Sequence, residues 1–98
     1  MASTKEYRDY ILEQLTDVPD VTCRPMMGEF LLYSAGVLFG GIYDDRLLVK
    51  IAPTNAEFGM RKELPYDGAK PMYLVDDVDD KIKLVEIINQ TLEGLNGK

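Results

Sequence analysis

The regular alternation of short apolar segments with two-residue breaks, between residues 21 and 51, constrains the fold most strongly. Four segments are rich in β-branched, aromatic and aliphatic residues, which favours β-strands. They span residues 21–27, 30–34, 37–43 and 46–51. The breaks between them are Gly28-Glu29, Ala35-Gly36 and Asp44-Asp45. Breaks of this length join tight hairpins, in which glycine supplies the positive φ, so the pattern predicts a four-stranded antiparallel meander.

Helical patterns lie on both sides of this meander. Ser3 and Glu6 have the spacing of a capping box, and apolar residues follow at helical intervals, so we expect a first helix with Ser3 as its N-cap. The acidic run 76–80 opens a last helix that is strongly apolar on one side. Between them we expect a short helix over residues 54–62 and a short strand over residues 72–75.

These elements, in the order α-β-β-β-β-α-β-α, predict an α+β fold with two layers. An antiparallel meander sheet would form one layer, and the N- and C-terminal helices would pack against it. The 98 residues fit a domain of ordinary size, and no linker or internal repeat divides them. We therefore expect residues 1–98 to form a single domain.

Hairpin pairing sorts the strand side chains into two faces, because their direction alternates along each strand. In the hairpin of the second and third segments, a two-residue loop places Leu32 opposite Phe39. In the next hairpin, the same loop length places Gly41 opposite Leu48. One face is then almost wholly apolar and is the expected core side: Leu31, Tyr33, Leu38, Ile42, Leu47, Val49 and Ile51.

The opposite face is amphipathic, yet more apolar than a solvated sheet face should be. It carries Phe30, Leu32, Val37, Phe39, Tyr43, Arg46, Leu48 and Lys50. We expect part of this face to be covered by another segment of the chain, by a second subunit or by a partner.

Charge and cysteine content limit the class of partner and the compartment. The chain has 17 acidic and 11 basic residues, a formal charge of -6, which disfavours direct binding to nucleic-acid phosphates. Cys23 is the single cysteine and is expected to be a structural thiol, so no internal disulfide can form. The N-terminal residues lack the apolar core of a signal peptide, and no apolar run reaches membrane-spanning length. We expect a cytoplasmic protein that does not bind membranes.

Catalytic and metal-binding patterns are weak. The sequence has no histidine, which removes the common nucleophilic triads and the usual zinc sites, so we expect no enzyme activity and no cofactor. The acidic run 76–80 lacks the glycine and glutamate spacing of a calcium loop, which favours a helix cap over a metal site. Gly40-Gly41 lies inside a strand, where it is expected to allow a bulge or close packing. Room for a ligand over Phe39 is the alternative.

A distinctive set of residues surrounds the second strand: Arg24, Met26 or Met27, Gly28, Tyr33, Gly36, Phe39, Gly40 and Lys50. This set resembles the pattern of the TfoX N-terminal domain family. Leu64-Pro65-Tyr66, the run 68–72 and Asp76-Asp77 resemble the small stand-alone, single-domain branch of that family. The resemblance implies a two-layer α/β fold and kinship with bacterial regulators of natural competence, which act with a transcription activator. Those regulators carry a second, helical domain, so a single-domain relative is expected to have a different partner.

Two hypotheses for function follow. The first is a non-enzymatic protein-interaction or regulatory module, with a homodimer as one version. It would use the apolar residues of the second face: Phe30, Leu32, Phe39 and Leu48. The alternative is a domain that binds a small anionic metabolite on that face. Its anion anchors would be Arg24, Lys50 or Lys70. Simple hairpin parity places Arg24 beside Tyr33, whereas a bulge near Gly28 would reverse its face.

Overall fold

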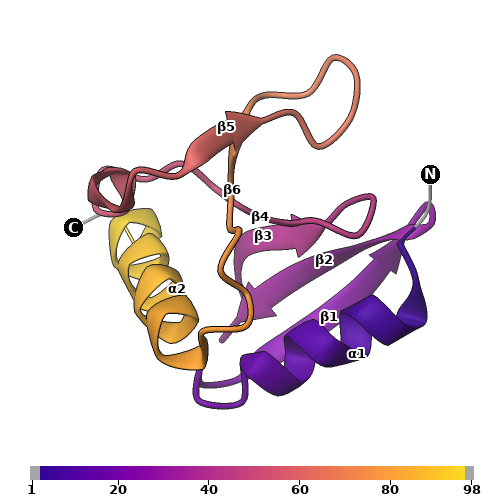
Figure 1. The fold of residues 1–98 in the computed structure, drawn as a ribbon, viewed down its shortest axis with the longest axis horizontal. Coiled ribbons are helices and arrows are strands. Elements are labelled where there is room, and N and C mark those ends of the chain that lie inside the picture. Colours follow the sequence, from indigo (N-terminus) through magenta and orange to yellow (C-terminus); the bar gives the residue numbers. More distant parts are fainter. Residues whose placement is uncertain (1–2, 97–98) are drawn as a thin grey trace.

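The computed structural model describes residues 3–96, which form an antiparallel sheet with two helices (Figure 1). The elements are α1 (Lys5–Gln14), β1 (Val21–Met26), β2 (Glu29–Ser34), β3 (Val37–Ile42), β4 (Leu47–Val49), the 3₁₀ turn η1 (Ala56–Phe58), β5 (Arg61–Glu63), β6 (Met72–Leu74) and α2 (Lys81–Leu95). The described strands lie in the order β1-β2-β3-β4-β6-β5. The predicted α+β fold and the meander of the first four strands are confirmed. Neither described helix is long and apolar enough to cross a bilayer.

The three turns of the meander all use left-handed backbone. Ala35-Gly36 and Asp44-Asp45 turn as predicted, with φ of 49° and 84° in the first and 55° at both residues of the second. The first turn falls at Met27-Gly28 rather than Gly28-Glu29, with φ of 52° and 86°. Two-residue turns with positive φ at both positions have a backbone twist that matches the right-handed twist of the two strands, so they suit these hairpins.

The first helix begins one residue later than predicted. Thr4 is the N-cap, and its hydroxyl accepts a hydrogen bond from the Tyr7 amide at 3.1 Å. Ser3 is buried instead, where its hydroxyl donates to the Glu29 carboxylate at 2.6 Å and accepts from the Asp45 amide at 2.9 Å. The serine therefore ties the N-terminal segment to two hairpin turns.

The helix predicted over residues 54–62 is wrong. The segment forms η1, then a left-handed residue at Gly59, and then the edge strand β5. Thr54 caps nothing, because its hydroxyl bonds to the Gln90 carbonyl of α2. Asn55 is fully buried, and its side chain bonds to backbone at Ala52 and Lys50 and to the Thr91 hydroxyl. These bonds to α2 and to local backbone fix the chain in a non-helical path.

The β2–β3 pairing contains an irregularity that simple parity missed. Ser34 pairs with Val37 as expected, but the register shifts after Tyr33, so that Leu32 pairs with Gly40 rather than with Phe39. The extra residue in β3 reverses the facing of β2 relative to β4. The β3–β4 register, in contrast, is the predicted one.

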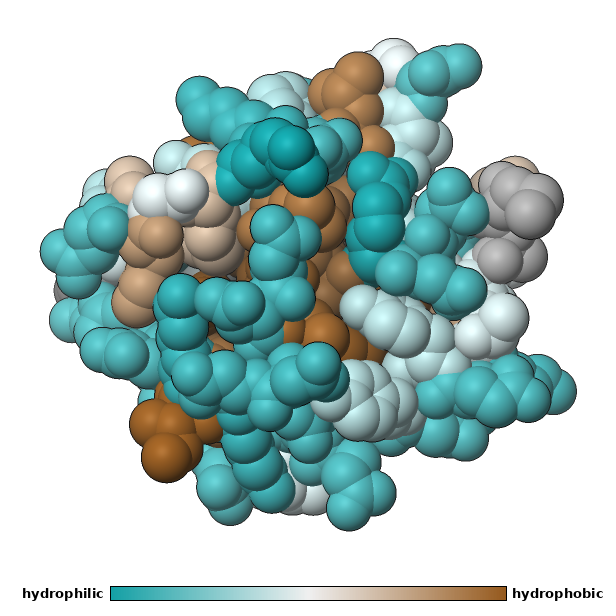
Figure 2. Space-filling model, viewed as in Figure 1, coloured by the Kyte–Doolittle hydropathy of each residue, from teal (hydrophilic) through white to brown (hydrophobic). Residues whose placement is uncertain are grey.

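Both helices pack against the face that carries the large apolar residues of β2. This core includes Ile11 of α1, Leu15 at the C-cap of α1, and Leu84, Ile87 and Ile88 of α2. Its strand residues are Phe30, Leu32, Phe39, Ile42, Leu47, Val49 and Tyr73, and Val75 directly after β6 also belongs to it. In Figure 1, α1 runs along β1 and β2, and α2 lies beside β3. Figure 2 shows that hydrophilic side chains enclose the apolar residues visible at the centre of this view.

The predicted assignment of the two faces is therefore correct for β4 but wrong for β2. Ile42, Leu47 and Val49 face the core as expected. Leu31 and Tyr33 were expected there as well, but they lie half-buried on the other face. Ile51 was also expected in the core and is 40% exposed.

Gly40 permits the close approach of β3 and β4. A Cβ on Gly40 would overlap the Leu48 carbonyl oxygen and lie 2.9 Å from the Val49 Cα. The close packing predicted for Gly40-Gly41 is confirmed. Phe39 lies in the core, so the alternative of a ligand above its ring is wrong.

The neighbouring leucines Leu31 and Leu32 test the assignment of the faces. We expect Leu32→Ala to lower the free energy of unfolding by about 2–5 kcal/mol, because it leaves a cavity in the core. Leu31→Ala is the matched control and should cost about 1 kcal/mol, because that side chain is half-buried. Urea denaturation of both variants measures the difference. Equal losses, or a larger loss for Leu31→Ala, would contradict the register described here.

Candidate functional site

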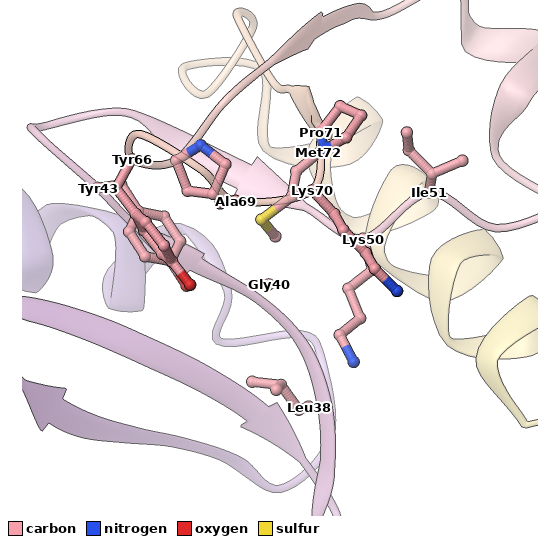
Figure 3. A pocket seen from close by; sticks show the side chains of 11 residues that line it. Leu38, Gly40, Tyr43, Lys50, Ile51, Tyr66, Ala69, Lys70, Pro71 and Met72 are labelled. Carbon is pink, nitrogen blue, oxygen red and sulfur yellow. The ribbon is translucent and has the colours of Figure 1, made fainter.

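The face of the sheet away from the helices carries a hollow of about 450 Å³. Its roof is the connection between β5 and β6, residues 64–71, and its floor comes from β3 and the end of β4 (Figure 3). The lining residues are Leu38, Gly40, Tyr43, Lys50, Ile51, Pro65, Tyr66, Ala69, Lys70, Pro71 and Met72. The expectation that another segment of the chain covers part of this face is confirmed.

Arg46 anchors the roof of the hollow. Its guanidinium donates to the Leu64 carbonyl at 3.3 Å and to the Tyr43 carbonyl at 3.2 Å, and it lies 3.7 Å from the Glu63 carboxylate. One side chain thus joins the β3–β4 turn to the start of the 64–71 connection. Because Arg46 forms this link, it is not free to act as an anion anchor in the hollow.

Two tyrosines form one side of the hollow. The rings of Tyr43 and Tyr66 lie 6.4 Å apart between centroids and are tilted by 53°, a favourable arrangement for an aromatic pair. Gly41 makes the position of Tyr43 possible, because a Cβ there would lie 2.8 Å from a Tyr43 ring carbon. Burial chiefly raises the pKa of Tyr43, with smaller contributions from Tyr66, Glu29 and Tyr33. The Tyr43 hydroxyl therefore stays protonated near neutral pH and can donate a hydrogen bond.

The charged residues that line the hollow are both lysines. Lys50 follows β4 and Lys70 belongs to the 64–71 connection, so the fold brings them together from separate segments. In Figure 3 their side chains lie on the side of the hollow away from Tyr43 and Tyr66. Among the described residues, neither lysine forms an ion pair. The hollow is thus locally cationic within a chain of formal charge -6.

Arg24 does not join this group. It shares a face with Tyr33, as simple parity predicted, but that face points away from the helices and Arg24 is exposed on it. There it lines a separate hollow of about 250 Å³ with Thr22, Tyr33 and Gly36. The shift of the first turn changes its partner from Tyr33 to Leu31, a step of two residues that leaves its face unchanged. The cation–π contact found in the described chain is instead between Arg8 and Phe30, at 5.2 Å.

The apolar residues proposed as a docking surface are buried within the chain. The exposed fractions of Phe30, Leu32, Phe39 and Leu48 are 8%, 0%, 0% and 0%. The first three lie in the helix-side core because of the extra residue in β3. Leu48 points to the other face, as predicted. The expectation that these four side chains form an exposed surface is wrong.

Sequence reasoning missed the aromatic side of the hollow. Tyr43 was assigned to the second face without a role, and no contact between residues 64–71 and the sheet was predicted. The signal was the composition of residues 65–71, in which a tyrosine and two prolines occur within seven residues. Local composition could have indicated a rigid apolar cover, but it does not say which strands the cover lies over.

The acidic run before α2 acts as a cap, as predicted. Asp80 is the N-cap and accepts from the Lys83 amide at 3.1 Å, while Asp77 pairs with the Lys83 ammonium at 2.9 Å. Asp79 accepts a hydrogen bond from the Tyr10 hydroxyl. Within residues 3–96, no group of three or more His, Cys, Asp or Glu side chains is arranged to hold a metal ion. Burial raises the pKa of the partly buried Cys23, which keeps it as a thiol.

A sheet with helices on one face and a roofed hollow on the other defines a two-layer α+β protein with a candidate ligand site. Residues 13–95 match the TfoX N-terminal domain family, and the chain belongs to that family. A protein of Spirochaeta aurantia, described as an uncharacterized 12.7 kDa protein in the trpE 5′ region, is 32% identical over 80 residues. The match covers 80% of this chain and 70% of that protein. The family resemblance stated from the sequence is confirmed.

The protonation of Tyr43 gives a pH test of the site. We expect its phenol to ionise above the ordinary value of 10.0, because burial disfavours the phenolate. With the folded-state pKa raised, its contribution to stability is complete below about pH 10 and is lost as the pH rises further. Titration of the tyrosine ring carbons by NMR, with Tyr43→Phe to assign the signal, measures this. A pKa at or below the ordinary value would contradict the described environment.

Proposed function

We propose that this protein binds a small molecule through an acidic group, without transforming it, and acts as a ligand-responsive regulator. The meeting of Lys50 and Lys70 in one hollow of an acidic chain carries this proposal. Their ammonium groups form charge-assisted hydrogen bonds with a carboxylate or phosphate, which are stronger than bonds between neutral groups. Of the three anion anchors expected from the sequence, the proposal keeps Lys50 and Lys70 and omits Arg24, which lines a different hollow.

The dimensions of the hollow support a small ligand. Small-molecule sites are commonly cavities of about 300–1,000 Å³ with mainly apolar walls and a few polar groups. The hollow, at about 450 Å³, lies within this range and has two cationic side chains among apolar neighbours. The polar groups of such a site fix the orientation of its ligand, and here the two lysines would do so.

The absence of transformation is also part of the proposal. The lining residues include no carboxylate, thiol, serine or threonine, and the sequence has no histidine to act as a general base near neutral pH. The chain belongs to the TfoX N-terminal domain family. The kinship with regulators of natural competence that this resemblance implies supports a regulatory role. Ligand binding would then change how the 64–71 connection meets a partner.

A protein partner is the second candidate, and a different observation favours it. Leu31, Tyr33 and Leu38 are half-buried on the sheet face away from the helices, and Arg24 is exposed next to Leu31. Light scattering of the wild type and of Tyr33→Glu tests self-association there. A wild-type dimer that Tyr33→Glu dissociates would support this candidate, whereas a monomer in both would count against the homodimer version.

Lysine variants test the ligand proposal directly. We expect benzoate, phenyl phosphate or citrate to raise the melting temperature of the wild type. Lys50→Ala and Lys70→Ala should each weaken binding about tenfold, the loss of roughly one charge-assisted bond. Lys62→Ala is the matched control, since Lys62 is exposed on β5 and does not line the hollow. Isothermal titration calorimetry measures the affinities.

Two results would overturn the proposal. One is the absence of any stabilisation by these acids at millimolar concentration. The other is an equal loss of affinity in Lys62→Ala and in the two hollow variants, since that outcome would reflect net charge alone.

A further inference from the structure

We infer that the ligand is an amphipathic acid, with a flat apolar body and a carboxylate or phosphate at one end. This inference rests on the proposed function, because it assigns a ligand class to the same hollow. The two chemical characters of the hollow lie on opposite sides of it: tyrosines on one side and lysines on the other (Figure 3).

The apolar side has the composition of a site for a ring. Tyr43 and Tyr66 present a tilted aromatic pair, and Figure 3 shows the Met72 thioether projecting into the space near them. Aromatic rings and methionine sulfur make favourable contacts with a further ring at offset or edge geometry. An inorganic anion would leave all three of these contacts unused.

The exposed apolar side chains at the edge of the hollow also indicate a ligand with an apolar body. Tyr66 is 59% exposed and Ile51 is 40% exposed, although both are large and border the hollow. In the free protein this apolar surface is in contact with water. A ligand with an apolar body would remove that water, whereas a purely polar ligand would not.

The two lysines set the direction of the acid group. Lys70 is exposed and Lys50 is partly buried, and both side chains lie on the side of the hollow away from the tyrosines (Figure 3). They come from separate segments and repel each other when no anion lies between them. A group with two or more oxygens can accept from both. Gly40 contributes only backbone to the lining of the hollow.

The lining also argues against sugars and nucleotides. Sugar hydroxyls and base amino groups donate hydrogen bonds, and inside a pocket they need acceptors. The hollow has no carboxylate or side-chain amide among its lining residues. A sugar or base would therefore lose hydrogen bonds to water without full replacement, and a body with few donors fits better.

Four probes test this inference by calorimetry on the full chain: 2-naphthoate, its neutral analogue 2-naphthalenemethanol, malonate and adenosine monophosphate. We expect 2-naphthoate to bind at least about tenfold more tightly than each of the others. Tyr66→Ala should weaken 2-naphthoate about fivefold to tenfold and leave malonate unchanged, because only the ring contact is lost. Lys70→Ala should weaken both acids.

Tyr33→Ala is the control for loss of a tyrosine on the same face, and it should leave 2-naphthoate binding unchanged. Circular dichroism confirms that each variant is folded. Malonate or adenosine monophosphate binding as tightly as 2-naphthoate would overturn the ligand class and leave the acid-binding function standing. Binding of the neutral analogue as tightly as the acid, or binding of no probe, would overturn both.

Discussion

The extra residue in β3 decides which side chains each strand presents to the helices. It turns Phe30 and Leu32 of β2 toward α1 and α2, on the same side as Ile42 and Leu47. Without it, β2 would present Leu31 and Tyr33 to the core, and Phe30 and Leu32 would lie on the other face. Gly40 follows Phe39 and allows β4 to approach at this irregular point. The core and the second face both depend on this local geometry.

The meander, two of its turns, the β3–β4 register and the cap of α2 could be predicted from the sequence. Each of them depends on residues that are close together in the chain. The extra residue in β3 could not be predicted in this way, because the alternation of side chains along a strand was counted as if every residue had one partner. The pairing of β6 with β4 and β5 joins residues that are far apart in the chain, so the local pattern of apolar residues does not predict it. Thr54 and Asn55 have the local character of a helix start, yet their bonds to α2 and nearby backbone prevail.

In the candidate site, too, the residue types could be predicted from the sequence, but their arrangement in space could not. Lys50 and Lys70 were named from the sequence as cations, but their meeting requires the 64–71 connection to fold back over the sheet. Tyr66 reaches Tyr43 by the same route. Arg24 had equal standing in the sequence and lies in a different hollow. Residue type thus predicted the chemistry of the site, whereas the long-range fold selected the residues that share it.

The central claim is that an acid binds between the lysines and tyrosines of this hollow. A titration of ¹⁵N-labelled protein with 2-naphthoate, followed by backbone amide shifts, tests it most directly. The account predicts saturable shifts concentrated at Lys50, Tyr66, Ala69 and Met72, with little change at Arg24 or in α1. Shifts centred on Arg24, shifts spread evenly over the surface, or no shifts at millimolar ligand would contradict it.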